Sequence, residues 1–465
     1  MYYMKTITTP IIPEKQTFFK VNAPHELDLK AICVFAAIGF FLDEDTYYHD
    51  TKVLRPGTKY TLDENDKVVN SNTYFNWYYE PRNISFEQAL DEFSTLFEAI
   101  IQEQTAGKKV ILPLSGGLDS RTQAVALKKM GAQVFSYSYE FENGYPETKI
   151  AEKIAKSCGF EFQKYKIKKG YLWEVIDDLV EINGCYSDFT SPRQMAIRNE
   201  FAKMGAVFSL GHWGDVLFDA MNLPELSHEH QVDVLMSKLL KRGGLEFAES
   251  LWQVWELEGH FKDYLRNRVT DLLNTIDIDD TNARLRAFKS KYWAPRWTSV
   301  NLAVFNNQKP MSLPYYDNRI CEFICTVPES YLKDRQLQIE YMKRSAPELA
   351  KIEWQVHRPF NLYNYHLNKP PYNLPYRMVN KLKREIKALL GNPYVQRNWE
   401  LQFLGKDNAF FLKQYILESG LDTWISKTFL NAQLSAFLKG DALKYAHTIN
   451  MLLTLSLFNK KQRHA

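Results

Sequence analysis

One stretch, Val110 to Arg121, constrains the fold of this 465-residue chain more than any other, and it reads VILPLSGGLDSR. Its apolar beginning, Val110 to Leu112, is typical of a strand buried on both faces. Two adjacent glycines, Gly116 and Gly117, let backbone N–H groups approach a ligand without interference from a Cβ atom. Apolar residues then recur at helical spacing, so we expect a helix from Arg121 to Met130. The order predicts a strand that leads through a glycine loop into a helix.

The polar residues of this loop favour a bound phosphate. Backbone N–H groups at a helix N-terminus bind anions, and the hydroxyls of Ser115 and Ser120 are further donors. The carboxylate of Asp119 would repel a phosphate unless a divalent cation lay between them, so we predict Mg²⁺ at this residue. The alternative is a tight turn between strand and helix that binds no ligand.

The motif SGGLDS resembles the SGGxDS signature of the PP-loop ATP pyrophosphatases, and the longer form LSGGLDS resembles asparagine synthetase. These enzymes hold ATP by its pyrophosphate and cleave it to AMP and pyrophosphate. The sequence has no Walker A loop, because GxxxxGK followed by Ser or Thr does not occur. The resemblance implies that ATP and Mg²⁺ are bound by the residues of the loop, which are Leu114, Ser115, Gly116, Gly117, Asp119 and Ser120.

Strands and helices alternate around the loop. A capping-box pattern at Ser85 and Gln88 predicts a long helix that leads into the first strand. After the loop, we expect strands from Gln133 to Tyr139 and from Glu161 to Ile167, with a helix from Glu147 to Cys158 between them. This alternation is typical of an α/β fold with a parallel sheet, and the resemblance implies a PP-loop domain with a helical C-terminal part.

A second run that ends in glycines and an aspartate lies at Val207 to Phe218, VFSLGHWGDVLF. Because strands of a parallel sheet bring their carboxyl ends to one edge, its carboxylate should lie near the loop. The run resembles the LSGEGADELFGG segment of the family, with Gly211 and Asp215 at matching positions. That register implies that Asp119 and Asp215 bind magnesium and that Gly211 lies at the nucleotide, whereas the alternative is Asp215 as a helix N-cap. The family's strand after the PP-loop helix lines the adenine pocket, which makes Ser136, Tyr137 and Ser138 candidates.

Two catalytic positions of the resembled family carry different residues here. The glutamate three residues before the aspartate corresponds to His212, which can act as a base or be structural. The lysine of the RxKxxF stretch, counted back from Phe360, corresponds to His357. The neighbouring Arg358 is a second candidate for a cation that stabilises charge on the leaving pyrophosphate.

The N-terminal part is rich in aromatic residues and short strand-like runs. LRPG at Leu54 to Gly57, followed by Tyr74 to Trp77, resembles the end of the glutaminase domain in asparagine synthetases. We therefore predict a small β-rich, truncated glutaminase-like segment at residues 1–80 and a synthetase domain at residues 81–465.

We expect no glutamine hydrolysis by this chain. The glutaminase nucleophile is a cysteine that follows the initiator methionine. The corresponding residue is Tyr2, and the first cysteine, Cys33, lies in an apolar run. About 80 residues are also too few for a complete amidotransferase domain.

Composition narrows the class of protein further. The formal charge of +3 gives no reason to expect nucleic acid or a membrane surface as a partner. Five scattered cysteines without a CxxC pair are typical of a reducing compartment. The longest apolar run, Ala31 to Leu42, is shorter than a membrane helix, and we expect a cytoplasmic protein.

The leading hypothesis is an ATP-dependent amide-bond ligase that adenylates a small-molecule or peptide carboxylate. The amine would be ammonia, the product of a separate glutaminase, or a group of the substrate itself, as in the family's lactam-forming and macrolactam-forming relatives. A nucleotide-binding pseudoenzyme or scaffold is the alternative suggested by the replaced catalytic residues. A PP-loop enzyme that modifies RNA is a third possibility, disfavoured by the near-neutral charge.

Overall fold

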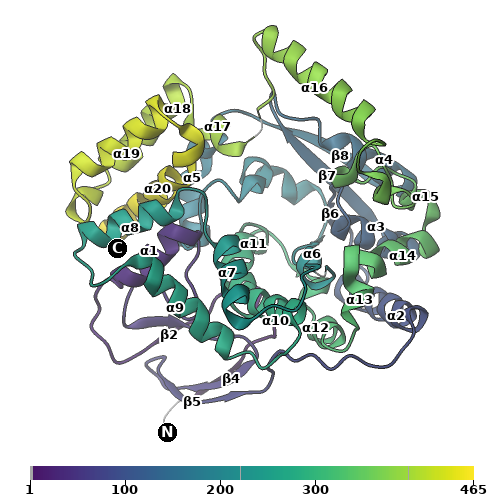
Figure 1. Cartoon of the computed structure of the whole chain (residues 1–465), viewed down its shortest axis with the longest axis horizontal. Helices are drawn as coiled ribbons and strands as arrows, with labels where there is room; N and C mark the ends of the chain where they lie inside the picture. The colour runs from purple at the N-terminus through teal and green to yellow at the C-terminus, as the bar shows by residue number, and fades with distance from the viewer. Residues whose placement is uncertain (1–3, 220, 396, 465) are drawn as a thin grey trace.

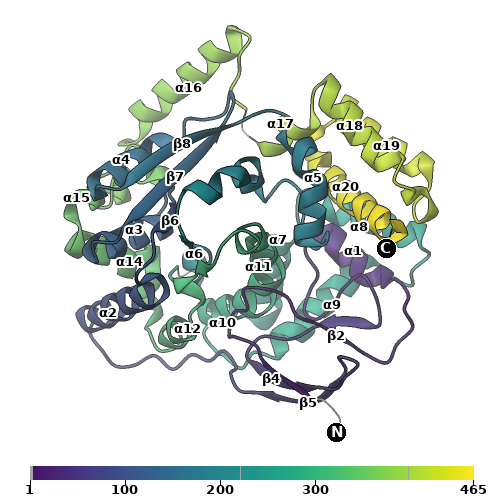
Figure 2. The same cartoon turned by 180° about the vertical axis from the view of Figure 1, so that it is seen from behind.

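A computed structural model describes residues 4–219, 221–395 and 397–464 of the chain. Its centre is a five-stranded sheet in the order β10-β9-β6-β7-β8, and every neighbouring pair is parallel. This confirms the α/β class with a parallel sheet, and Figures 1 and 2 show the sheet flanked by helices. The strands are β6 (Val110–Pro113), β7 (Val134–Phe141), β8 (Glu161–Ile167), β9 (Val207–Ser209) and β10 (Met311–Ser312).

The helices around the first strands begin and end close to the predicted residues. The helix α2 (Phe86–Thr105) starts at a complete capping box, in which the Ser85 hydroxyl accepts from the Gln88 N–H and the Gln88 side chain accepts from the Ser85 N–H. The helix α3 (Asp119–Lys129) follows β6, and α4 (Thr148–Cys158) ends at Gly159 in the left-handed conformation that favours glycine. Local capping therefore fixes the start of α2 and the end of α4.

Both faces of the sheet are covered. The helices α2, α3 and α14 (Gln336–Ser345) pack on one another, and α4 packs on β7 and β8. Elsewhere, Phe201 of the 3₁₀ segment η1 (Arg193–Lys203) contacts the rings of Tyr137 on β7 and Phe208 on β9. Phe208 in turn contacts Phe305 of α11 (Ser299–Asn306). Burial on both faces explains why the strands read as continuous apolar runs.

The N-terminal part is β-rich, as predicted. A three-stranded antiparallel sheet is formed by β1 (Lys5–Thr8), β4 (Thr58–Leu62) and β5 (Val68–Thr73), and a two-stranded sheet by β2 (Phe18–Lys20) and β3 (Thr51–Val53). Tyr2, on which the expectation of a missing glutaminase nucleophile rests, lies outside the described residues.

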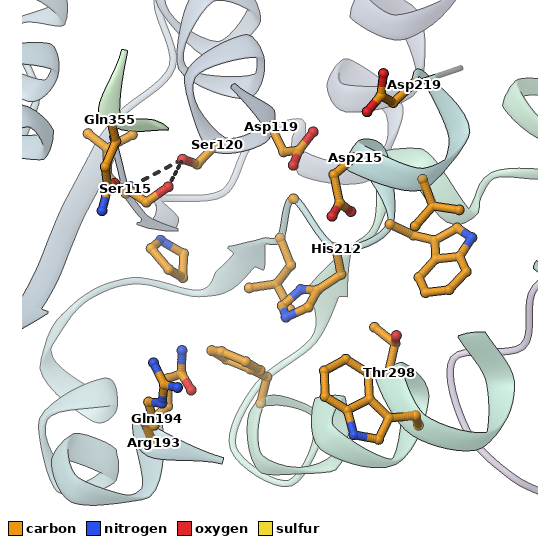
Figure 3. Close-up of a pocket in the computed structure, with 18 of the residues that line it drawn as sticks. Ser115, Asp119, Ser120, Arg193, Gln194, His212, Asp215, Asp219, Thr298 and Gln355 are labelled. Carbon is orange, nitrogen blue, oxygen red and sulfur yellow. Dashed lines mark hydrogen bonds between the residues drawn. The ribbon is translucent and has the colours of Figure 1, made fainter. Parts of the chain in front are cut away.

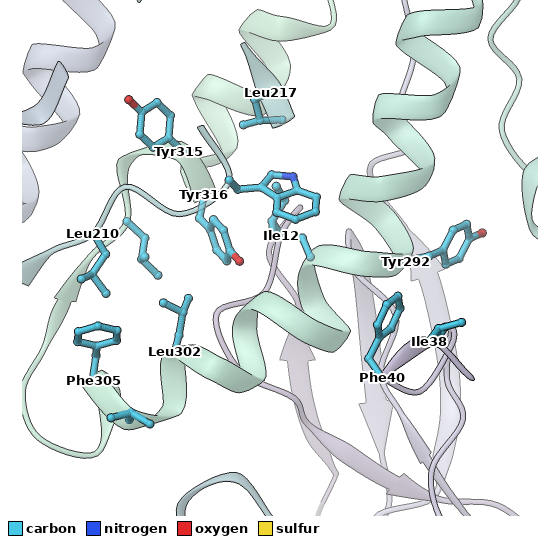
Figure 4. Close-up of a cluster of buried hydrophobic side chains, with 14 of the residues drawn as sticks. Ile12, Ile38, Phe40, Leu210, Leu217, Tyr292, Leu302, Phe305, Tyr315 and Tyr316 are labelled. Atoms are coloured by element: carbon cyan, nitrogen blue, oxygen red, sulfur yellow. The ribbon is translucent and has the colours of Figure 1, made fainter. Parts of the chain in front are cut away.

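The helix α1 (Leu29–Ile38) joins the N-terminal part to the rest of the molecule. It packs on α8 (Gly244–Val254), and Figure 4 shows Ile12, Ile38 and Phe40 in one apolar cluster with residues from beyond position 200. Cys33 is fully buried there, and burial raises the pKa of its thiol, which disfavours the nucleophilic thiolate. The division at residue 80 stays a prediction, because the two parts share a hydrophobic core.

The helical C-terminal part consists of α17 (Asn398–Phe403), α18 (Lys406–Leu417), α19 (Lys427–Lys439) and α20 (Ala442–His464). Buried residues of α20 close the core, and the ring of Phe458 stacks on Tyr47 with centroids 3.5 Å apart. The ring of His447 hydrogen-bonds the Ala36 carbonyl at 2.8 Å. The last helix therefore packs on the N-terminal part.

The remaining helices lie mainly between β9 and the C-terminal part. In the described ranges, no helix combines the length and the apolar content that crossing a membrane requires. The remaining helices of the chain, most of which follow β9, are α5 (Tyr171–Asn183), α6 (Gly214–Leu217), α7 (His228–Leu239), α9 (Phe261–Asn274), α10 (Thr281–Phe288), the π-helix η2 (Lys289–Thr298), α12 (Asn318–Ile324), α13 (Glu329–Leu332), α15 (Pro347–Ala350) and α16 (Leu374–Leu389).

Candidate active site

A cavity of about 900 Å³ opens at the carboxyl edge of the parallel sheet. Figure 3 shows its lining side chains, which come from the loops after β6 and β9, from β7, and from segments far away in the sequence. Ligands of such sheets bind at this edge. Of the residues predicted from the sequence, the cavity is lined by Leu114, Ser115, Asp119, Ser120, Tyr137, Ser138, Gly211, His212 and Asp215.

The loop after β6 presents hydrogen-bond donors to the cavity. The hydroxyls of Ser115 and Ser120 lie 3.1 Å apart, and the Ser120 hydroxyl also accepts from the Ser115 N–H. The Gly117 N–H donates to the Ser115 hydroxyl at 3.2 Å. The helix α3 has no side-chain cap at its N-terminus, so its first N–H groups are available to a ligand. Hydroxyls beside an uncapped helix N-terminus suit an anion such as phosphate.

A later segment packs directly on this loop. The Gly116 N–H donates to the Gln355 side chain at 3.1 Å, and the Gln355 N–H donates to the Gly116 carbonyl at the same distance. The fully buried Arg121 donates to the Gly116 carbonyl and to the backbone carbonyls of Ile352 and Glu353. A Cβ atom at Gly116 would lie 2.8 Å from the Cβ of Gln355, so this close approach requires glycine.

Three carboxylates gather beside the loop, namely Asp119, Asp215 and Asp219 (Figure 3). Asp119 forms an ion pair with Arg335 and accepts from Gln338 at 3.2 Å. Burial raises the pKa of Asp119 to about 6, against the effect of Arg335 and with a contribution from the negative charge of Asp215. Burial also raises the pKa of Asp219. A cation between Asp119 and Asp215 would relieve their repulsion.

The two predicted ligands fit magnesium when phosphate completes the site. Among the residues that the structure describes, no three His, Cys, Asp or Glu side chains form a metal site by themselves. Mg²⁺ commonly takes one or two carboxylates, with the other ligands supplied by substrate phosphates and water. Asp119 and Asp215 line the same cavity as the two serines and therefore supply this donor set.

His212 is half-buried in the wall of the cavity. Burial lowers the pKa of its imidazole to about 4, although the charge of Asp215 opposes the shift. The ring packs against Phe305 with centroids 6.0 Å apart, and Nδ1 has no hydrogen-bond partner among the described residues. At neutral pH the ring is uncharged, and a ligand could supply the missing partner.

A π-helix forms another wall. Four residues of η2, namely Lys289, Trp293, Trp297 and Thr298, line the cavity. The wider turn of a π-helix, about 4.4 residues, brings positions four or five apart to one face. Burial lowers the pKa of Lys289 to about 8, and the carboxylates of Asp215 and Asp219 oppose the shift.

The strand β7 brings two of its three predicted residues to the cavity. Ser136 is fully buried, and its hydroxyl donates to the Glu161 carbonyl at 2.7 Å, so it does not line the cavity. Tyr137 and Ser138, which were also predicted, line it, together with Tyr139 and with Arg193 from η1. Side chains alternate along a strand, so Ser136 and Ser138 lie on one face, and Ser138 lies nearer the carboxyl end, where the cavity opens. A role for Ser136 itself stays a prediction.

His357 and Arg358 lie outside the cavity lining. The His357 ring packs against Trp354 and Tyr365, with centroids 4.2 and 5.4 Å away, and its Nδ1 lies 3.3 Å from the Asn368 amide. Burial lowers the pKa of His357. The residue that enters the cavity from this segment is Gln355.

Several residues of the site were not selected from the sequence. Asp219 could have been found, because it follows Asp215 by four residues. The run from Lys289 to Trp297 could also have been found, because it is dense with aromatic and basic residues. Gln355 and Arg335 gave no local signal, since each reaches the site through contacts with residues more than 200 positions away.

The fold and the site together define an α/β protein that presents a phosphate-binding loop at the edge of a parallel sheet. The family model for asparagine synthase matches residues 92–344, more than half of the chain. The chain therefore belongs to the asparagine synthase family, whose members are ATP-dependent amide-bond ligases. The match contains the loop, both aspartates, Lys289 and Arg335, and it ends before Gln355 and His357.

Other comparisons are more distant. The structure of NMN synthetase from Francisella tularensis is 15% identical and covers 44% of this chain and 93% of its own, with a TM-score of 0.23. A search of curated protein sequences gave no match.

Proposed function

We propose that this chain is an AMP- and pyrophosphate-forming amide-bond ligase that activates a carboxylate as its adenylate. One observation carries the proposal: a single cavity joins the serine and glycine loop, two carboxylates suited to magnesium and an aromatic wall. The loop and α3 would hold the pyrophosphate of ATP, and the aromatic wall would hold the acyl substrate. Both reactants would then meet beside Asp215.

The reaction has two steps. A carboxylate oxygen of the substrate attacks the α-phosphorus of ATP, and the bond to pyrophosphate breaks. An amine then attacks the acyl carbon, its proton is lost, and AMP leaves. Mg²⁺ held by Asp119 and Asp215 would offset the negative charge that gathers on the pyrophosphate.

The cation proposed for the first step is Lys289. It lines the cavity and lies close enough to Asp215 and Asp219 for their charges to shift its pKa, whereas His357 packs among aromatic rings outside. Because the Lys289 ammonium is half-buried, it would attract the negative charge that develops on the phosphates more strongly than a fully exposed ammonium would. The pKa of about 8 leaves Lys289 mostly charged at neutral pH.

The amine would come from outside the chain or from the substrate. Free ammonia and a separate glutaminase are both compatible with a site that opens to solvent, and an amine on the substrate would give a lactam or macrolactam. His212, uncharged at neutral pH and with an unpartnered Nδ1 among the described residues, would form a hydrogen bond with that amine.

The test measures pyrophosphate release from ATP and Mg²⁺ with a panel of carboxylic acids and amines. With an acid that supports turnover, Asp215→Asn should lower the rate by about 10²-fold or more, because the metal site loses a charged ligand. Asp407→Asn, an exposed aspartate on α18, is the matched control and should leave the rate unchanged. Equal rates for the parent and Asp215→Asn would refute the metal assignment.

A second candidate function is nucleotide binding without turnover. The ion pair between Asp119 and Arg335 favours it, because the arginine occupies a carboxylate oxygen that magnesium would use. Calorimetric titration with MgATP separates the two functions. Binding of MgATP without pyrophosphate release for any acid in the panel would support the second, and any acid-dependent release would exclude it.

A further inference from the structure

The helix α16 stands apart from the rest of the molecule. Figures 1 and 2 show it projecting from the body beside α4 and β8. None of its residues, all of which the structure describes, is buried. Isolated helices of about this length are marginal in water, so such a helix gains stability from a surface that covers it. Exposed apolar side chains on α16 are Leu374, Met378, Val379, Leu382, Ile386 and Leu389, with exposed fractions from 42% to 87%.

Both ends of α16 are attached to the body. Before the helix, the Asn373 amide donates to the Asn368 side chain at 3.2 Å, and the Asn368 amide lies 3.3 Å from Nδ1 of His357 in the body. After it, the Val395 N–H donates to the Asn143 carbonyl at 3.2 Å, and the rings of Tyr145 and Tyr394 stack with centroids 4.8 Å apart. The exposed helix is therefore held in place and is not a loose extension.

The apolar side chains of α16 form one continuous face. At about 100° per residue, the six residues fall within an arc of roughly 140°, and Leu390 just beyond the helix extends it to roughly 160°. This apolar face of α16 consists of aliphatic residues without an aromatic anchor. Interfaces between proteins typically concentrate their binding energy in aromatic and arginine anchors, so the face suits lipid better than a protein pocket.

The opposite face is strongly basic. Between Leu374 and Leu389 the sequence has five basic residues and one acidic residue, a formal charge of +4 where the whole chain carries +3. Lys381 and Lys383 fall just outside the two edges of the apolar face. The single acid, Glu385, falls inside the arc of the apolar face, about 20° from one edge, and pairs with Lys381 at 3.8 Å. Lysines at both edges can extend toward phosphates while the apolar face is buried.

We propose that α16 docks the protein onto an anionic lipid surface, with its apolar face in the acyl boundary and its lysines at the headgroup phosphates. The charge of α16 disfavours other molecules as its binding partner. A second copy would bring two helices of +4 together, and a nucleic acid would contact the basic residues but leave the apolar face exposed. An anionic lipid surface is complementary to both faces at once.

The experiment is vesicle flotation with the full chain. Vesicles of phosphatidylcholine alone are compared with vesicles of equal parts phosphatidylcholine and phosphatidylglycerol, at low and high salt. The protein should float with the mixed vesicles, remain in solution with the neutral ones, and lose most of its binding at high salt.

Matched variants locate the surface. Leu382→Gln should weaken partitioning roughly tenfold through the lost apolar burial, and Lys383→Gln roughly fivefold through the lost charge. Both keep a good helix former at the position. Phe410→Gln, which removes a side chain 63% exposed on α18, and Lys427→Gln on α19 are the controls and should float like the parent. Circular dichroism checks that each variant is folded.

Two results would overturn the proposal. One is a parent protein that remains in solution with the mixed vesicles, which would leave an acidic protein surface as the occupant of α16. The other is a Leu382→Gln variant that floats as well as the Phe410→Gln control.

Discussion

Two walls of the same cavity are built in different ways. The sheet-edge wall comes from two continuous segments, the loops after β6 and β9, in which Ser115, Asp119 and Asp215 follow directly from their strands. The helical wall is assembled from η2 and from the segment around Gln355. The first wall depends on local sequence order, whereas the second depends on long-range packing.

This difference separates the residues that carry the family motif from those that only the tertiary structure brings to the cavity. The sheet-edge wall carries the motif by which the chain resembles its family, and the family match includes it. In the segment at residues 354–360, His357 packs outside the cavity, while Lys289 enters from another element. Under the proposed function, Lys289 would supply the cation that the family resemblance assigns to His357.

The largest expected effect is on the helical wall. Lys289→Met should lower kcat/KM for pyrophosphate release by about 10²- to 10³-fold, because the cation is lost while the apolar stem is kept. Steady-state kinetics with an acid that supports turnover checks this. Lys291→Met, on the same π-helix but outside the cavity lining, is the control. A Lys289→Met enzyme with the parent's kcat/KM would show that the helical wall supplies no essential charge.

The contact between the two walls can be broken at one glycine. Gly116→Ala should lower the free energy of unfolding by about 1 to 3 kcal/mol. The new Cβ would lie 2.8 Å from the Cβ of Gln355, and that atom cannot move away without a shift of its backbone. Chemical denaturation measures the change. Gly117→Ala is the matched control, because its Cβ would meet only the Ser115 hydroxyl, at 3.3 Å. If both variants were equally stable, the Gln355 segment would not be packed on the loop as described.

The stability of the folded chain should depend on pH through His212, which lies in the sheet-edge wall. Its pKa of about 4 lies below the ordinary value of 6.5, so between these pH values the unfolded chain binds a proton that the folded chain does not. His212 therefore adds a contribution to stability that rises as the pH increases from about 4 to 6.5.

The change is measured as the difference between the parent and His212→Gln in thermal unfolding across that pH range. Subtracting the two curves removes the effect of His447, whose pKa burial also lowers to about 4. A flat difference curve would mean that His212 titrates alike in the folded and unfolded chains.

The smallest effect is expected at His357. His357→Asn should change kcat/KM by less than about threefold, because the ring lies outside the cavity and a polar side chain can keep the contact with Asn368. The same assay serves as for Lys289→Met. A loss as large as that of Lys289→Met would return the catalytic cation to the segment at residues 354–360.

Much of the fold could be predicted because its signals are local. The capping box at Ser85 and the apolar run at Val110 act within one or two turns of chain, so α2 and β6 appear where expected. Ser136 shows the limit. Its position on β7 was predicted correctly, but whether its side chain reaches the cavity depends on the neighbouring strand. There the Ser136 hydroxyl donates to the Glu161 carbonyl.

The sequence by itself determined the strand, loop and helix that present Ser115 and Asp119, because each step depends on neighbours within a few residues. Only the tertiary structure decided that Arg335 pairs with Asp119, that Gln355 caps the loop and that Lys289 faces the cavity. The first two contacts join residues separated by more than 200 positions. No periodicity or short motif encodes them, because they form only when the burial of whole faces brings distant segments together.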